Sequence, residues 1–145
     1  MPEVREIIFY GKSGDGIHLL VDRLVQDLIK RGFYVIAYPE YDPERRETIA
    51  RIHVRISRDP IYERGPVTKP EVAVLMDARL LRYAEEALGA GKIIVNTPSK
   101  DLLSNYLGDS DIKPELYVID LYGLRGKGID YTPRITELVT KALGL

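Results

Sequence analysis

The chain has 145 residues, of which 45% are hydrophobic, so it is long enough to bury a sizeable core of its own. Its 21 basic and 22 acidic residues give a formal charge of −1, which excludes a global attraction to nucleic acid or to an anionic membrane. There is no cysteine, so this chain supplies neither a disulfide nor a thiolate ligand for zinc or an iron–sulfur cluster. We expect a single domain over residues 1–145.

The sequence contains no long apolar run. Its first apolar segment, residues 7–10, is too short for a signal peptide, and no stretch reaches the roughly 18 apolar residues of a membrane span. We therefore expect a cytoplasmic protein without a membrane partner. Charged residues make up 30% of the chain while Gln occurs only once, a bias that favours a thermophilic source.

The first expected elements form a strand–loop–helix–strand unit. Residues 4–10 are rich in β-branched and aromatic side chains, which predicts a short buried strand. Residues 17–31 carry apolar side chains at helical spacing, which predicts a helix that ends at Gly32. Residues 33–38 predict a second buried strand, so the unit has the length that a parallel crossover needs.

The next two segments differ in character. Residues 48–56 alternate apolar side chains with Arg51, His53 and Arg55, which predicts a strand with one dry and one basic face. Such a strand is typical of an antiparallel or edge member of the sheet. Residues 57–71 contain three prolines and one glycine and predict a long surface connection, of the kind that often serves a partner or ligand.

Strands and helices then alternate. The pattern predicts strands at 72–76, 92–95 and 116–121, and helices at 79–88, 99–106 and 132–143. This order predicts an α/β fold: a three-layer sandwich with a mostly parallel, Rossmann-like sheet plus an antiparallel or edge strand.

The glycine-rich segment at 11–16 is the first candidate binding site. In a parallel sheet it lies at the carboxyl edge, where a helix N-terminus offers free N–H groups to a phosphate. Its glycines let a ligand approach the main chain, but the spacing is neither that of the dinucleotide-binding motif nor that of the P-loop. From the residues alone, an anion-binding loop and a plain turn both remain open.

The tripeptide Gly14-Asp15-Gly16 also invites a thiamine diphosphate interpretation. Such sites hold Mg²⁺ with this Asp and with an Asn further along the chain, because the ion prefers oxygen ligands. No Asn stands in the corresponding window of this sequence, which argues against that cofactor here.

A basic segment leads into the alternating strand. Arg45 and Arg46 precede the strand whose polar side carries Arg51, His53 and Arg55, and guanidinium groups bind carboxylates and phosphates bidentately. This favours a surface for an acidic partner or for coenzyme phosphates. The alternative is a solvated edge strand whose charges pair with nearby glutamates, namely Glu40, Glu44 and Glu47. Aromatic residues do not interleave with these charges, which argues against nucleic-acid binding.

The remaining polar residues do not form a self-sufficient catalytic set. His18 and His53 have no partners at metal-ligand spacing, so we expect ordinary surface or satisfied histidines and no metal site. A second glycine-rich basic loop at 122–131 follows the last strand and is a candidate neighbour of the first loop at the same sheet edge.

Taken in order, these segments resemble the gamma subunit, or gamma domain, of the pyruvate/2-oxoacid:ferredoxin oxidoreductases. The family's Gly-x-Gly-Gly-Gln-Gly loop is matched by GKSGDG at 11–16, and its Tyr-Gly-Pro-Glu-x-Arg segment by YDPERR at 41–46. The family's Val-Arg-Ile-Ser strand end recurs at 54–57, with DPI at 59–61. PEVAVLMD and GAGKIIVNTP fit the family's next two strands, so the likeness covers about residues 4–98.

The resemblance implies a non-catalytic subunit of a complex that oxidatively decarboxylates a 2-oxoacid, transfers the acyl group to coenzyme A and passes electrons to ferredoxin. It implies that thiamine diphosphate and 4Fe-4S clusters reside in the partner subunits, alpha and beta, with delta as a further candidate. It implies no catalytic or metal-binding residue in this chain. The residues that it assigns to a coenzyme A-facing site are Gly11, Lys12, Ser13, Gly14, Asp15, Gly16, Tyr41, Glu44, Arg45 and Arg46.

The sequence also departs from the family pattern. Ser13 and Asp15 replace a glycine and a glutamine of the family's loop, and a carboxylate at 15 opposes phosphate binding unless it caps the helix. Family members usually continue for a few tens of residues, so the C-terminal part is expected to be shortened, in a subunit completed by a partner or in a divergent paralogue. A stand-alone Rossmann-like nucleotide-binding or regulatory module is the second interpretation, and a homodimer of the isolated chain stays open.

Overall fold

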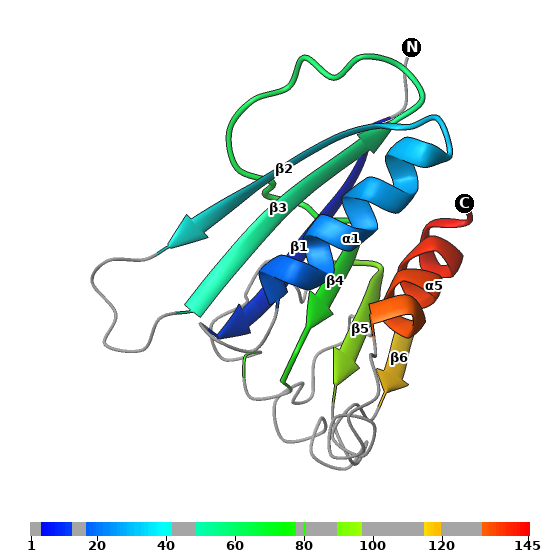
Figure 1. The fold of residues 1–145 in the computed structure, drawn as a ribbon. Coiled ribbons are helices and arrows are strands. Elements are labelled where there is room, and N and C mark those ends of the chain that lie inside the picture. The colour runs from blue at the N-terminus through cyan, green and yellow to red at the C-terminus, as the bar shows by residue number, and fades with distance from the viewer. Residues whose placement is uncertain are drawn as a thin grey trace.

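The computed structural model describes residues 4–12, 17–41, 49–77, 80, 90–96, 115–119 and 132–145. Within these ranges the chain forms an α/β fold in which helices pack on a six-stranded sheet (Figure 1). The elements in chain order are β1 (Arg5–Lys12), α1 (Ile17–Lys30), β2 (Tyr34–Tyr41), β3 (Ile49–Ser57), β4 (Val72–Leu75), β5 (Lys92–Asn96), β6 (Glu115–Ile119) and α5 (Thr132–Leu143).

The sheet has the strand order β2-β3-β1-β4-β5-β6. Strands β1, β4, β5 and β6 pair in parallel, while β3 is antiparallel to both β1 and β2. Five of these six strands therefore run in one direction, which confirms the mostly parallel sheet with an antiparallel member.

The alternating strand, predicted to be an antiparallel or an edge member, is antiparallel and lies inside the sheet. β3 lies between β2 and β1, so the crossover through α1 joins two parallel strands that have a third strand between them. Both faces of β3 are buried, whereas most of β2 is exposed or half-buried. Pro39 of β2 has no N–H to donate, which suits an edge strand and leaves the interior place to β3. The expectation that residues 33–38 form a buried strand is therefore wrong for most of β2.

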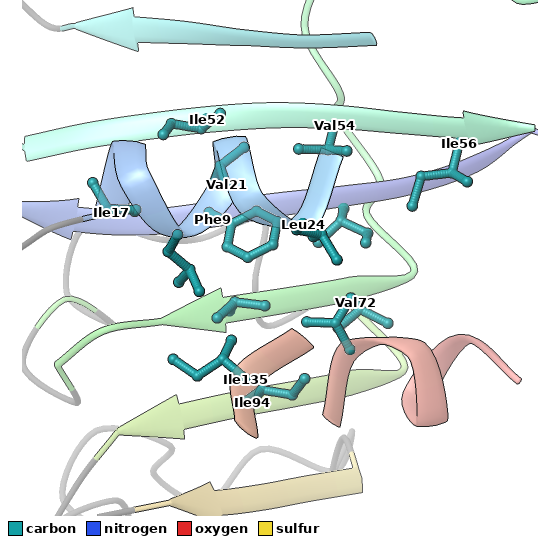
Figure 2. Packing of buried hydrophobic residues seen from close by; sticks show 14 of the residues in the cluster. Phe9, Ile17, Val21, Leu24, Ile52, Val54, Ile56, Val72, Ile94 and Ile135 are labelled. Carbon is teal, nitrogen blue, oxygen red and sulfur yellow. The ribbon is translucent and has the colours of Figure 1, made fainter. Parts of the chain in front are cut away.

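Helices α1 and α5 cover one face of the sheet. Side chains of α1 such as Leu20 and Leu24 pack against Phe9 of β1 and Val54 of β3, and Ile135 of α5 joins the same cluster (Figure 2). The helical spacing noted in the sequence produces this contact because it places the apolar residues on one side of α1. Each fully buried Leu or Ile contributes roughly 1.5–3 kcal/mol to this core.

The opposite face carries a second apolar cluster. Ile8 and Tyr10 of β1 pack with Leu75 of β4 and Ile93 of β5, and Val67 of the connection before β4 joins them. That connection therefore forms part of the cover of this face. The helices predicted at 79–88 and 99–106 and the loop at 122–131 lie outside the described residues.

Glycine ends α1 and α5, as predicted. Gly32 has a φ of 92°, and the N–H of Phe33 donates to the carbonyl of Leu28 at 3.1 Å while Gly32 N–H donates to Ile29 at 3.0 Å. These two bonds form a Schellman motif, which satisfies carbonyls at the helix end. Gly144, with a φ of 73°, ends α5 in the same way.

Replacing Gly32 with alanine should lower the free energy of unfolding by about 1 kcal/mol, because a Cβ disfavours a left-handed backbone. Space is not the cause, since the added Cβ would come no closer than 3.9 Å to Arg58. Gly91→Ala is the matched control: Gly91 has no positive φ and its Cβ would lie 4.0 Å from the Glu71 carbonyl oxygen. Urea denaturation followed by circular dichroism measures both variants, and equal losses would contradict the cap assignment.

Candidate functional site

The carboxyl edge of the sheet is where both predicted binding segments leave it. β1 and β2 run in the same direction, and Gly11 and Tyr41 both align with Ala50 of the intervening β3. With strands about 4.8 Å apart, the two exits lie on the order of 10 Å from each other. Segments 13–16 and 42–48 therefore start from neighbouring points of one edge.

The structure describes Gly11, Lys12 and the main chain of Tyr41 among the predicted site residues. Gly11 and Lys12 are the last residues of β1 and align with Ala50 and Ile49, so the strand extends past its predicted end at residue 10. Gly11 is buried in the sheet and Lys12 is half-buried. The other predicted residues lie outside the described ranges, namely Ser13, Gly14, Asp15, Gly16, Glu44, Arg45 and Arg46.

Hydrogen bonds tie neighbouring strand ends together at this edge. The side-chain amide of the buried Asn96 donates to the carbonyl of Met76 at 2.9 Å, and Met76 N–H donates to the carbonyl of Tyr10 at 3.0 Å. The segments that follow β1, β4 and β5 therefore start from fixed points. The sequence analysis did not predict a role for Asn96. It could have been found from the sequence as an amide residue at the end of a strand whose preceding residues are apolar.

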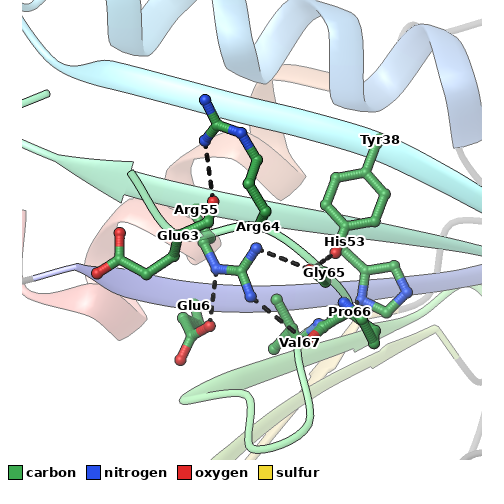
Figure 3. A network of polar contacts seen from close by, with 9 residues as sticks. All are labelled: Glu6, Tyr38, His53, Arg55, Glu63, Arg64, Gly65, Pro66 and Val67. Carbon is green, nitrogen blue, oxygen red and sulfur yellow. Dashed lines mark hydrogen bonds and ion pairs between the residues drawn. The ribbon is translucent and has the colours of Figure 1, made fainter. Parts of the chain in front are cut away.

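A buried polar network lies on the face opposite α1, beneath the connection that precedes β4 (Figure 3). Val67 N–H donates to His53 Nδ1 at 3.0 Å, so the ring proton is on Nε2, which donates to Glu40 Oε2 at 2.6 Å. Tyr38 stacks on the His53 ring with centroids 5.0 Å apart, and its hydroxyl donates to the Gly65 carbonyl. His53 is thus a satisfied core histidine.

Arg55 completes the network and is only 5% exposed. Its Nε donates to Glu6 Oε2 at 3.0 Å and its Nη1 to the Gly65 carbonyl at 2.9 Å. The prediction of a basic surface for an acidic partner or coenzyme phosphates is therefore wrong for His53 and Arg55. The solvated-strand alternative is also wrong for these two, which are buried, although His53 does contact one of the glutamates named in that alternative, through the hydrogen bond from Nε2 to Glu40.

The connection over residues 57–71 explains why the polar side of β3 is not open to solvent. Ile61 and Val67 are buried and hold the connection against the sheet, while Tyr62 between them is 81% exposed. The expectation of a connection at the surface is thus only partly right, because part of it serves as a lid on His53 and Arg55. The two apolar side chains, in a segment otherwise rich in proline and charge, were the feature of the sequence that indicated contact with the sheet.

A cavity of about 350 Å³ lies between α1 and α5. Its walls carry Arg23 and Arg31 beside Asp27 and Glu137, and Arg31 forms an ion pair with Asp27 at 3.2 Å. Since the charges balance, the cavity has no electrostatic preference for an anion. It is therefore a weaker candidate for a phosphorylated ligand than the carboxyl edge.

Two further properties concern the described part of the chain alone. Its residues contain no group of three or more His, Asp or Glu side chains that could hold a metal ion. Neither of its helices is long and apolar enough to cross a membrane.

Comparison with known proteins relates nearly the whole chain to one family. The family described as pyruvate ferredoxin/flavodoxin oxidoreductase matches residues 6–140. The gamma subunit common to pyruvate and ketoisovalerate oxidoreductases of Pyrococcus abyssi is 31% identical over 145 residues, which cover 97% of this chain and 78% of the relative.

Solved structures share the fold. Pyruvate oxidoreductase subunit PORC from Thermotoga maritima matches with a TM-score of 0.67 at 24% identity, over 86% of this chain and 66% of that chain. The 2-oxoglutarate:ferredoxin oxidoreductase of Magnetococcus marinus, solved with 2-oxoglutarate, coenzyme A and succinyl-CoA, matches with a TM-score of 0.63 at 15% identity, over 88% of this chain and 22% of that chain. With the sequence match, these findings show that the chain belongs to the pyruvate ferredoxin/flavodoxin oxidoreductase family, among its gamma-type subunits.

Proposed function

We propose that the chain is the gamma-type subunit of a 2-oxoacid:ferredoxin oxidoreductase complex and that it contributes a glycine segment to a composite coenzyme A-facing site. The complex would decarboxylate a 2-oxoacid oxidatively to an acyl-CoA in the cytoplasm, with ferredoxin as electron acceptor. Thiamine diphosphate and 4Fe-4S clusters belong to the alpha and beta subunits in this proposal. The chain binds and orients, and supplies no catalytic group.

The observation that carries the proposal is the shared exit of segments 13–16 and 42–48 from one edge of the sheet. Coenzyme A presents phosphate anions, which main-chain N–H groups at a helix start and arginine side chains both bind. α1 begins at Ile17 directly after the glycine segment, and its first turn holds no acidic residue, so Asp15 is the only carboxylate that the sequence places beside the helix start. Arg45 and Arg46 of the second segment would supply the guanidinium groups.

Membership of the complex is tested by recovering the tagged chain from an extract of its native host. Mass spectrometry should identify the alpha and beta subunits, and the eluate should turn over a 2-oxoacid with coenzyme A and ferredoxin. Recovery of the chain alone with a bound nucleotide would contradict the proposal and would support the stand-alone module instead.

Reversing the charge at the end of β1 should weaken coenzyme A binding. In the reconstituted complex, Lys12→Glu is expected to raise the KM for coenzyme A by about 10-fold with little change in kcat, because it replaces attraction to the phosphates by repulsion. Lys69→Glu makes the same charge change at an exposed position before β4, at the other end of the strands. The control should leave KM unchanged, and equal effects of the two variants would remove Lys12 from the coenzyme site.

A further inference from the structure

We propose that the isolated chain forms a symmetric dimer in which the free edge of β2 pairs with the β2 edge of a second copy. Among the described residues β2 pairs with β3 alone and forms one edge of the sheet (Figure 1). Tyr34 is 51% exposed and Ala37 is also exposed. The first five residues of β2, 34–38, carry no charge, and an uncharged free edge is a template for pairing with another strand.

The main-chain groups that β2 directs to its free edge follow from the sheet's alternation. The carbonyl of Tyr10 accepts a bond from Met76 on the β4 side, so the main-chain groups of the preceding residue, Phe9, face β3. The pairings of β3 continue without a bulge on both sides. Along β3, residues whose main-chain groups face β1 alternate with residues whose groups face β2. The residues of β2 that bond to β3 therefore alternate with residues whose N–H and C=O groups point away from the sheet, and Val35 and Ala37 belong to the second set.

Pro39 agrees with this assignment. Ile52 of β3 aligns with Phe9 on one side and with Pro39 on the other. The main-chain N–H and C=O of Ile52 bond to Phe9 on the β1 side. β3 therefore offers Pro39 no carbonyl that needs a donor, and the proline nitrogen has no hydrogen to donate. Proline in a sheet occupies such outward positions of edge strands. Val35 and Ala37 belong to the same outward set as Pro39.

The sequence of this edge is complementary to itself. Tyr34-Val35-Ile36-Ala37-Tyr38 reads almost the same in both directions, with an aromatic residue at each end and Ile36 at the centre. A twofold axis at Ile36 sets Tyr34 opposite the partner's Tyr38, Val35 opposite the partner's Ala37, and Ile36 opposite its own copy. Val35 and Ala37 would then make the hydrogen-bonded pairs, and no charge opposes the approach.

A single cysteine tests the register, because the chain has no cysteine of its own. Ile36→Cys places two thiols in a directly opposed, non-hydrogen-bonded pair, whose Cα separation of about 4.5 Å suits a disulfide. Ala37→Cys is the matched control, since its thiol faces Val35 and lies roughly 7–8 Å or more from its own copy. Under mild oxidation most of the Ile36→Cys chain should run as a covalent dimer, and the control should not. No cross-linking, or equal cross-linking, would overturn the proposal.

Sedimentation of the full chain tests the association itself. The wild-type chain should be a dimer at tens of micromolar, and Ala37→Pro should raise the dissociation constant by about 10-fold or more, because each copy loses an outward N–H. Ala37→Ser keeps that N–H and should behave as wild type. Circular dichroism checks that both variants are folded. A monomeric wild-type chain, or an Ala37→Pro variant that dimerises as tightly as the wild type, would contradict the proposed dimer.

Discussion

Replacing Gly14 with aspartate is expected to lower kcat/KM for coenzyme A by about 100-fold or more in the reconstituted complex, with the fold intact. The proposal places the coenzyme phosphates against the main chain of the glycine segment, where only a residue without a Cβ allows close approach. The new carboxylate would also stand directly before Asp15 in the sequence and add a second negative charge near the phosphates. Steady-state kinetics with coenzyme A as the varied substrate measures the loss.

Gly91→Asp is the control for this experiment. Gly91 lies directly before β5, at the amino edge of the sheet, and an added Cβ would meet only the Glu71 carbonyl oxygen at 4.0 Å. The same charge and side chain are therefore added far from the proposed site, and turnover should not change. If Gly14→Asp leaves kcat/KM as it is in the wild type, the glycine segment takes no part in coenzyme binding.

Replacing Arg55 with methionine is expected to lower the free energy of unfolding by about 3 kcal/mol. The change keeps much of the side chain's length but removes the donors to Glu6 and to the Gly65 carbonyl. Breaking a buried ion pair leaves its partners without compensation, which typically costs about 3–5 kcal/mol. The Glu6 side chain is 34% exposed and regains some water, so the low end of that range applies.

Arg64→Met is the matched control within the same connection. Arg64 donates to the carbonyls of Ile61 and Glu63 and its side chain is exposed, so its loss should cost no more than about 0.5 kcal/mol. Urea denaturation of both variants gives the comparison. Losses of similar size would mean that the buried network does not hold the connection onto the sheet.

The local parts of the fold could be predicted from the sequence. The spacing of apolar residues gave α1 its buried side, and Gly32 and Gly144 marked both helix ends because only a left-handed backbone closes those caps well. The alternating pattern of β3 correctly separated Val54 from Arg55. These features depend on a few neighbouring residues.

The arrangement of the strands could not be predicted in the same way. Alternation says which side chains share a face of β3, but it does not say which strands lie beside it. The interior place of β3 and the burial of His53 and Arg55 depend on contacts with distant segments, above all with Gly65 and Val67. The alternation of basic and apolar residues in the sequence is the same whether the basic side of the strand faces solvent or is covered by another segment.

For the candidate site, the common edge followed from the rule that parallel strands end together, and the structure brings the exits after β1 and β2 to that edge. The strand extends through Gly11 and Lys12 because both pair with β3, which the glycine-rich pattern concealed. The roles of residues 13–16 and of Glu44, Arg45 and Arg46 stay predictions.

Hydrogen exchange of the reconstituted complex, with and without saturating coenzyme A, tests the central claim most directly. Coenzyme A should slow amide exchange about 5-fold or more in peptides spanning 11–17 and 42–48, because phosphate contacts protect those N–H groups. Peptides over 58–71, on the covered face away from the carboxyl edge, should exchange as before. Unchanged exchange in both segments while coenzyme A is bound would contradict the account.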